Sequence, residues 1–291
     1  MLQLAYKHLS IVAEIRLTEL QAQIDAIPDF TEKVSEAQRL WTNKTGSDAG
    51  KKTFHEVKGT LTEMCIAVKV CNYCEHNEAT DIEHIAPKSF FPEFTFVWDN
   101  YLLACKTCNT GYKLDKCHVL DPDGNVHEIK RGSGKPPYPT IAMINPRSEN
   151  PTDFMLLNTA TFIFEIIGTD TIAKNKAAKT IEVLDLNNRD TLKEARKSLH
   201  HAFYDSMDRL SRIVKADSMV EIEDILRPHE DLIKGATENI DELKEKIKQG
   251  YKKYIQDKPH PSVWYAIKTI DSKVHPKWQK LFEIIPEALE W

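Results

Sequence analysis

Apolar residues recur every three or four positions near the start of the chain, which is the spacing of one buried helix face. The pattern runs through Leu2, Tyr6, Leu9, Ala13, Leu17 and Leu20. Pro28 interrupts it, and a second helix is expected from Thr31 to about Leu40. The polar segment 43–52 contains two glycines and is expected to be a loop. Residues 1–64 are therefore predicted to form an N-terminal helical segment.

Helical periodicity returns in the second half of the chain, from about Asn150. Three amphipathic stretches are expected to be helices, at 170–186, 190–213 and 236–255. Region 150–291 is accordingly predicted to be helical. The segment 121–149 is rich in turn residues, so it is expected to be a loop-rich connector at the surface.

Residues 65–120 follow a different pattern, with short β-like runs, several aromatic residues and all six cysteines of the chain. A strand needs only a few residues, whereas a helix needs a longer periodic run. We therefore expect a mainly α-helical protein with a small α+β module at 65–120, held between helical segments.

The composition argues against a disordered chain and against a membrane protein. The chain has 291 residues, of which 41% are apolar and 29% charged, so it can bury a core and is not disordered throughout. The apolar stretch 155–168 is interrupted by Asn158 and Glu165 and is too short to span a bilayer. The first twenty residues lack the small-residue cleavage site of a signal peptide. We expect a cytoplasmic protein without a membrane anchor.

The formal net charge is −5, from 39 basic and 44 acidic residues. A protein that binds nucleic acid over its whole surface is expected to be basic. Any contact with nucleic acid must therefore be local, or a partner must supply the positive surface.

Four of the six cysteines form two pairs with CxxC spacing: Cys71, Cys74, Cys105 and Cys108. Two thiolates three residues apart can bind one zinc ion from a tight knuckle, and two knuckles complete a tetrahedron. A redox-active pair is the alternative, but it needs only one CxxC in a βαβ context. We predict a structural zinc site. Cys65 is expected in the core, and Cys117 with His118 is a weaker metal candidate.

The residues between the two pairs carry polar groups that a zinc ribbon does not need. Residues 81–89 read DIEHIAPKS, and residues 98–104 read WDNYLLA and lead into the second pair. The segment 68–118 resembles the HNH endonuclease family of the ββα-metal fold, in an H-N-N variant that has Asn at the last position. The matching elements, in chain order, are Cys71/Cys74, Glu83-His84, Asn100 and Cys105/Cys108-Asn109.

This resemblance implies metal-dependent hydrolysis of phosphodiester bonds. Neutral His84 would take a proton from the attacking water, because an unperturbed imidazole titrates near pH 6.5. Glu83 and Asn109 would offer hard oxygen ligands to Mg²⁺ or Mn²⁺, which would polarise the phosphoryl oxygen. Asn100 would hold the His84 loop in register. Lys113, on the helix after the second pair, would contact a phosphate.

Each of these residues also has an ordinary structural interpretation. Asn109 could cap a helix, and Asn100 could belong to a turn. Glu83 could be a solvated strand carboxylate, while Lys113 and Lys88 could be surface lysines. The catalytic interpretation requires the imidazole and a hard cation to reach the same phosphorus atom from one cleft.

Short phrases extend the resemblance to the HNH effectors of bacterial anti-phage systems, the Septu type and its retron-associated relatives. They are the knuckle CxYCE, the string EHIAPKS, the run WxNYxLACxxCN, and TIxxLxLN at 180–187. The resemblance implies an ABC-type ATPase partner, joined in the retron-associated form by a reverse transcriptase with its RNA–DNA. Helical flanks can pack against such a partner; a self-contained helical bundle is the alternative.

Three hypotheses follow. The first is a metal-dependent HNH endonuclease acting on DNA or RNA in anti-phage defence. The second is a zinc-stabilised module that binds nucleic acid or protein without cutting. The third is a helical scaffold with a vestigial nuclease domain. Glu83-His84 with Asn100 and Asn109 separates the first from the second, because zinc binding alone does not require these residues. Mg²⁺- or Mn²⁺-dependent nicking of plasmid, alongside RNA degradation, separates the first from the third.

Overall fold

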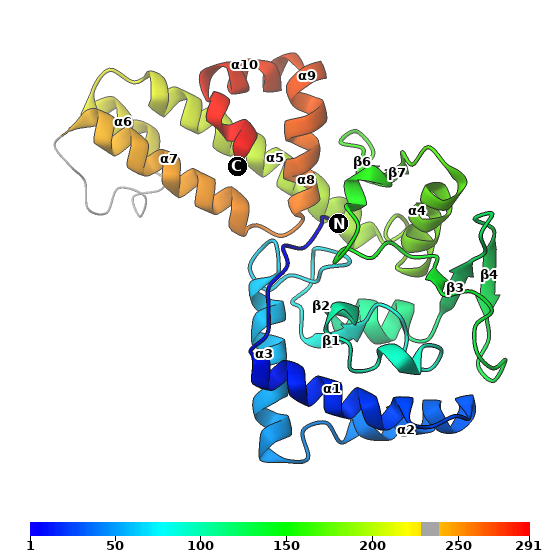
Figure 1. Ribbon diagram of the computed structural model, residues 1–291. Coiled ribbons are helices and arrows are strands. Elements are labelled where there is room, and N and C mark those ends of the chain that lie inside the picture. Colours follow the sequence, from blue (N-terminus) through cyan, green and yellow to red (C-terminus); the bar gives the residue numbers. More distant parts are fainter. Residues whose placement is uncertain (228–238) are drawn as a thin grey trace. The chain divides into compact units, whose positions relative to one another are not determined.

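The computed structural model describes residues 1–227 and 239–291, and it divides into two compact units (Figure 1). The first unit comprises Met1–Leu156 and Phe164–Asp190, and the second comprises Leu157–Ile163 and Thr191–Trp291. Helices predominate and the sheets are small and antiparallel, which confirms the expectation of a mainly helical chain with a small α+β part. No helix in the described part of the chain has the length and apolar character needed to cross a bilayer.

Three helices open the first unit: α1 (Ile11–Asp25), α2 (Phe30–Thr42) and α3 (Asp48–Glu63). Residues 1–10 are not helical, because the hydroxyl of Ser10 accepts a hydrogen bond from the backbone of Ala13 and starts α1 there. The prediction of a loop over residues 43–52 is wrong in its second half. Ser47 accepts a hydrogen bond from the amide of Gly50, so α3 begins at Asp48.

A two-stranded hairpin followed by a short helix occupies the cysteine-rich region (Figure 1). Strand β1 (Asp81–His84) pairs antiparallel with β2 (Tyr101–Ala104), and η3 (Thr107–Lys113) follows directly. The connection between the strands contains two single turns, η1 (Pro92–Phe94) and η2 (Trp98–Asn100). Helix α3 packs against β2, so the N-terminal helices and the hairpin share a core.

A second sheet follows in the order β4-β3-β5, formed by β3 (Cys117–Leu120), β4 (Val126–Ile129) and β5 (Thr140–Ile141). The segment predicted to be a loop-rich connector therefore contains two strands, β4 and β5, and each pairs with β3, which precedes the segment. The turn from β3 to β4 is closed by Asp121, whose carboxylate accepts hydrogen bonds from the backbone amides of Asp123 and Asn125. The apolar side chains of this sheet pack against the β1–β2 connection.

The first unit ends with η4 (Pro151–Asp153), the strands β6 (Met155–Leu157) and β7 (Phe164–Ile166), and α4 (Thr171–Val183). The prediction of helix from Asn150 onward is wrong for the residues before α4, because the apolar run 155–168 forms the short strands β6 and β7. Apolar runs of this length do not distinguish a strand from a helix by periodicity alone. The helix expected at 170–186 is confirmed.

The second unit is helical. Its elements are α5 (Asp190–Lys215), α6 (Met219–Leu226), α7 (Ile240–Asp257), α8 (Pro261–Ala266), η6 (Ile267–Asp271), α9 (Ser272–Val274), α10 (Pro276–Ile284) and η7 (Pro286–Glu290). The helices expected at 190–213 and 236–255 correspond to α5 and α7, although residues 236–238 lie outside the described residues. Phe203, Trp264, Trp278 and Phe282 form an aromatic core.

Candidate metal centre and active site

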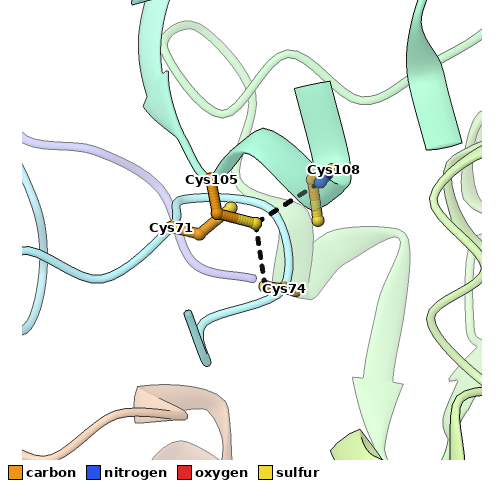
Figure 2. Close-up of side chains that lie close together, drawn as sticks. All are labelled: Cys71, Cys74, Cys105 and Cys108. Carbon is orange, nitrogen blue, oxygen red and sulfur yellow. Dashed lines mark hydrogen bonds between the residues drawn. The ribbon is translucent and has the colours of Figure 1, made fainter. Parts of the chain in front are cut away.

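Four cysteine side chains converge in the first unit (Figure 2). The Sγ atoms of Cys71, Cys74, Cys105 and Cys108 all lie within 4.8 Å of one another, and all four residues are buried. A zinc ion with Zn–S bonds of about 2.3 Å places its four sulfur atoms about 3.8 Å apart. Cys74 Sγ and Cys105 Sγ are separated by 3.9 Å. The cluster thus has the composition and spacing of a structural zinc site, as the sequence predicted.

The register of the β1–β2 hairpin explains why the two pairs meet. Asp81, at the start of β1, pairs with Ala104, at the end of β2. The first knuckle precedes β1 and the second follows β2, so both lie at the same end of the hairpin. Asn72 fixes the first knuckle there, because its backbone and side-chain amides both donate to the carbonyl of Leu103, at 3.1 and 3.0 Å.

The electrostatics of the cluster favour a bound cation. Hydrogen bonding with Cys108 lowers the pKa of Cys105, and the same contact raises the pKa of Cys108. Burial raises the pKa of Cys71 well above its usual range. Without a cation the thiols therefore resist being deprotonated together. A divalent ion supplies the missing positive charge, because coordinating thiols are deprotonated by the metal.

Two side chains outside the CxxC pairs support the cluster. Arg189 Nη1 donates to Cys108 Sγ at 3.5 Å, and its guanidinium carbon lies 4.8 Å from the ring centroid of Tyr112. Asn77 Nδ2 donates to Cys105 Sγ at 3.7 Å. Donors to thiolates hold them in place and offset their negative charge. Arg189 was not foreseen from the sequence, because it lies 81 positions from Cys108 and no local pattern connects the two residues.

The remaining two cysteines do not belong to the cluster. Cys117 packs in an apolar core with Phe90 and Phe91, and burial raises its pKa to about 12. Cys65 is half-buried, and its thiol donates to the carbonyl of Leu61. Within residues 1–227 and 239–291, the four-cysteine cluster is the one group of His, Cys, Asp and Glu side chains placed to share an ion.

His84 lies at the other end of the hairpin, opposite Tyr101. Its Nε2 lies 3.0 Å from the carbonyl oxygen of Thr95, and the hydroxyl of Tyr101 donates to that same oxygen at 2.6 Å. A carbonyl oxygen can only accept, so Nε2 carries the proton and Nδ1 keeps its lone pair. No described residue forms a hydrogen bond with Nδ1.

Aromatic rings enclose the imidazole. The ring centroid of His84 lies 4.2 Å from that of Trp41 and 5.3 Å from that of Tyr101. Burial lowers the pKa of His84 well below its usual value, and the nearby ammonium groups of Lys88, Lys113 and Lys44 lower it further. The ring is consequently neutral at pH 7, which is the state that a general base requires.

The side chain of Asn100 links the start and the end of the segment that connects β1 to β2. Its Oδ1 accepts from the amide of Ala86 at 2.7 Å, and its Nδ2 donates to the carbonyl oxygens of Ala86 and Phe94 at 3.0 and 2.9 Å. Ala86 follows His84 by two residues. The side chain thereby ties the chain leaving β1 to the turn that precedes β2, which is the arrangement that the resemblance implies for this residue.

The position of Lys113 corrects the expected phosphate contact. Its side chain is 1% exposed, its Nζ lies 2.5 Å from Glu83 Oε1, and it also donates to the carbonyl of His84 at 2.8 Å. A lysine that is enclosed in this way cannot reach a phosphate in solvent. Its ammonium opposes the effect of burial on that carboxylate, because burial raises the pKa of Glu83 and Lys113 lowers it.

The expected Mg²⁺ or Mn²⁺ ligands do not form a cation site in this arrangement. The ammonium of Lys113 takes the place beside Glu83 that a cation would need. Asn109 instead donates to Asp81 Oδ2 at 3.1 Å. His84 and Glu83 are both buried, whereas Asn109 lines a groove with Asp81 and Trp41. The single cleft expected for all three residues is therefore not present.

Three residues at the histidine were not foreseen from the sequence: Trp41, Lys44 and Thr95. Trp41 and Lys44 come from the N-terminal helical segment, which was expected only to flank the α+β module. No spacing rule relates a helix end to a distant strand.

Comparison of the chain with protein-family models, with curated proteins and with solved structures finds no match.

Proposed function

We propose that this chain is an endonuclease of the HNH type, which hydrolyses phosphodiester bonds of nucleic acid with His84 as general base. The hydrogen bond between His84 Nε2 and the carbonyl of Thr95 carries the proposal. It leaves the lone pair on Nδ1, the atom that would take a proton from water. Because His84 is 5% exposed, that water would have to enter the aromatic enclosure. The order of strand, strand and helix around the cysteine cluster supports the same proposal.

The proposed step needs positive charge near the phosphate as well as a base. When water attacks phosphorus, His84 takes its proton, and negative charge grows on the phosphoryl and leaving oxygens. Lys44 and Lys88 lie close enough to the imidazole to lower its pKa, and both can face that charge. The resemblance also assigns a divalent cation to Glu83 and Asn109. Binding it there would require Lys113 to release Glu83.

One observation favours the second candidate, a zinc-stabilised module that binds nucleic acid or protein without cutting. The ion pair between Lys113 and Glu83 satisfies both charges internally, as a purely structural pair does. The two candidates make opposite predictions for His84, since a binding module does not need a basic imidazole.

The test compares the full chain with His84→Ala on supercoiled plasmid DNA and on single-stranded RNA. Each is incubated with Mg²⁺, with Mn²⁺ and with chelator, and cut ends are counted on gels. Loss of a general base typically lowers the rate by about 10²–10⁴-fold. We expect the variant to keep its zinc content and its circular dichroism spectrum while losing cleavage of whichever substrate is cut.

The matched control is His8→Ala, which removes an exposed histidine of the same unit. It is expected to cut at the wild-type rate. Wild-type cleavage by the His84 variant rules out the base, and a wild-type chain that cuts neither substrate favours the binding module.

The resemblance adds a partner to the proposal, an ABC-type ATPase that holds the nuclease in an anti-phage complex. The net charge of −5 supports this, because a partner would supply positive surface along a long substrate. Co-purification of the tagged chain with the product of an adjacent ATPase gene tests it, and a chain that elutes alone at its monomer mass speaks against it.

A further inference from the structure

The N-terminal helices form one wall of a groove in the first unit. This wall carries Lys44, after the end of α2, and Lys51, His55 and Lys58 on α3, and the opposite wall carries Asp81 and Asn109. The groove has a volume of about 480 Å³. We call it the lysine groove. It lies outside the segment that the HNH resemblance covers, apart from the residues of its second wall.

The charge of the lysine groove is opposite to that of the whole chain. Three lysines face a single carboxylate, that of Asp81, in a protein whose net charge is −5. Asp81 accepts hydrogen bonds from Asn109 at 3.1 Å and from the hydroxyl of Thr80 at 2.9 Å, so its charge is partly satisfied within its own wall. A groove lined by one sign of charge concentrates ligands of the other sign.

The lysines are available to an anion. Lys44 donates to the carbonyl of Trp41 and lies over its ring, 4.3 Å from the centroid. Lys51 contacts Asp48 at 3.2 Å, but both side chains are largely exposed, so this pair contributes little. Neither Lys44 nor Lys58 forms a salt bridge with an acidic side chain in the described part of the chain.

The spacing along α3 suits a repeating anion. Lys51, His55 and Lys58 stand at positions i, i+4 and i+7, which share one helix face. At about 1.5 Å of rise per residue, the two lysines are separated by roughly 10 Å along the helix axis. Cations distributed along an axis can contact successive phosphates of one strand, whereas a single small anion would need them to converge.

The position of Lys44 is fixed by the backbone. A Cβ atom at position 50 would overlap the carbonyl oxygen of Lys44, so glycine at this position lets the 43–47 loop close onto the start of α3. Trp41 then lines the groove with one part of its ring system and packs against His84, 4.2 Å away between centroids. The groove therefore runs to the aromatic cover of the imidazole.

We infer that the lysine groove binds the sugar–phosphate backbone of a nucleic acid and directs it to His84. The N-terminal helices would then form part of the substrate site. This inference rests on the proposed endonuclease function, but it concerns binding and can be tested without cleavage.

The test uses the full chain carrying His84→Ala, so that no probe is cut. Fluorescence anisotropy measures its affinity for labelled 20-nucleotide single-stranded RNA, single-stranded DNA and duplex DNA, at 50 and 200 mM NaCl. Adding Lys51→Glu and Lys58→Glu is expected to weaken binding at least tenfold for the preferred probe. Loss of two phosphate contacts should also reduce the slope of log K against log salt by about 1.4 for a single strand.

The matched control adds Lys33→Glu and Lys52→Glu, on α2 and α3, which make the same change in net charge outside the groove. It should bind within about twofold of the His84→Ala parent. Equal weakening by both double variants, or none by the groove variant with any probe, overturns the inference. If His84→Ala cuts normally, the proposed base fails, and the same binding series repeated without added Mg²⁺ or Mn²⁺ decides the role of the groove. The preferred probe identifies the sugar and the strandedness.

Discussion

Trp41, in the last turn of α2, packs its ring against that of His84, at the end of β1, with 4.2 Å between centroids and 65° between planes. The indole also lies near Phe54, Phe96 and Tyr101, so the imidazole sits in an aromatic enclosure. Such an enclosure shields most of the ring from bulk water and favours its neutral form. The N-terminal helices thus contribute to the burial that lowers the pKa of His84.

Cleavage should persist at acidic pH. Burial lowers the pKa of His84 well below 6.5, with Lys88 as the next cause. A base works only when unprotonated, so kcat/KM should stay level as pH falls through 6.5 and decline only below it. Rates measured between pH 4.5 and 8 test this. A pH profile of kcat/KM whose acid limb, the decline on the acidic side, is centred at 6.5 or above contradicts it.

Opening the aromatic enclosure should move that acid limb. Trp41→Leu exposes the imidazole to water, so the pKa of His84 should rise toward its ordinary value and the limb should shift to higher pH. Trp98→Leu is the control, because Trp98 donates to the carbonyl of Lys7 and packs on Tyr101 instead. A Trp41 profile that coincides with the wild-type profile would show that the indole does not control the imidazole.

Loss of one cluster thiol should destabilise the hairpin region. Cys105→Ser removes a ligand from the four-cysteine cluster, whereas Cys117→Ser alters a cysteine that packs in the core. Binding of structural zinc contributes directly to folding free energy. At about 3 °C per kcal/mol for a chain of this size, the Cys105 variant should melt roughly 10 °C lower and lose its zinc. Metal analysis showing one zinc per chain in both variants would contradict the site.

Asn100→Ala should loosen the connection between β1 and β2. It removes three hydrogen bonds and leaves the buried amide and carbonyl of Ala86 without partners. The free energy of unfolding should fall by about 2–3 kcal/mol, measured by urea denaturation. Asn100→Asp keeps the acceptor for the Ala86 amide and should recover part of the loss. Equal stability of the alanine variant and the wild type would exclude the structural role.

Lys113 and Glu83 should behave as a coupled pair. Lys113→Met leaves a buried carboxylate without its cation, which typically costs about 3–5 kcal/mol. Adding Glu83→Gln removes the charge, so the double variant should recover most of that stability. Chemical denaturation of the two single variants and the double variant measures the coupling. Lys116→Met, at an exposed position nearby, should have little effect. Strictly additive losses would mean that the two side chains act independently.

The sequence alone determined the elements whose signal is local. CxxC spacing identified the four cysteines of the cluster, because a zinc knuckle is built from neighbouring residues. The long amphipathic stretches became α4, α5 and α7, since helix periodicity is read over many residues. Predictions from short apolar runs were wrong. Strands β6 and β7 lie where a helix was expected, and β4 lies in a predicted connector.

Only the tertiary structure decided what surrounds His84 and Glu83. A lysine can contact a phosphate if its side chain reaches solvent, and it contacts a protein carboxylate if the two are buried together. Lys113 is buried with Glu83. Trp41 and Lys44 approach the imidazole because α2 and α3 pack over the hairpin. Long-range packing leaves no periodic trace in the chain, so local spacing identifies the metal ligands but not the partners of a buried imidazole or carboxylate.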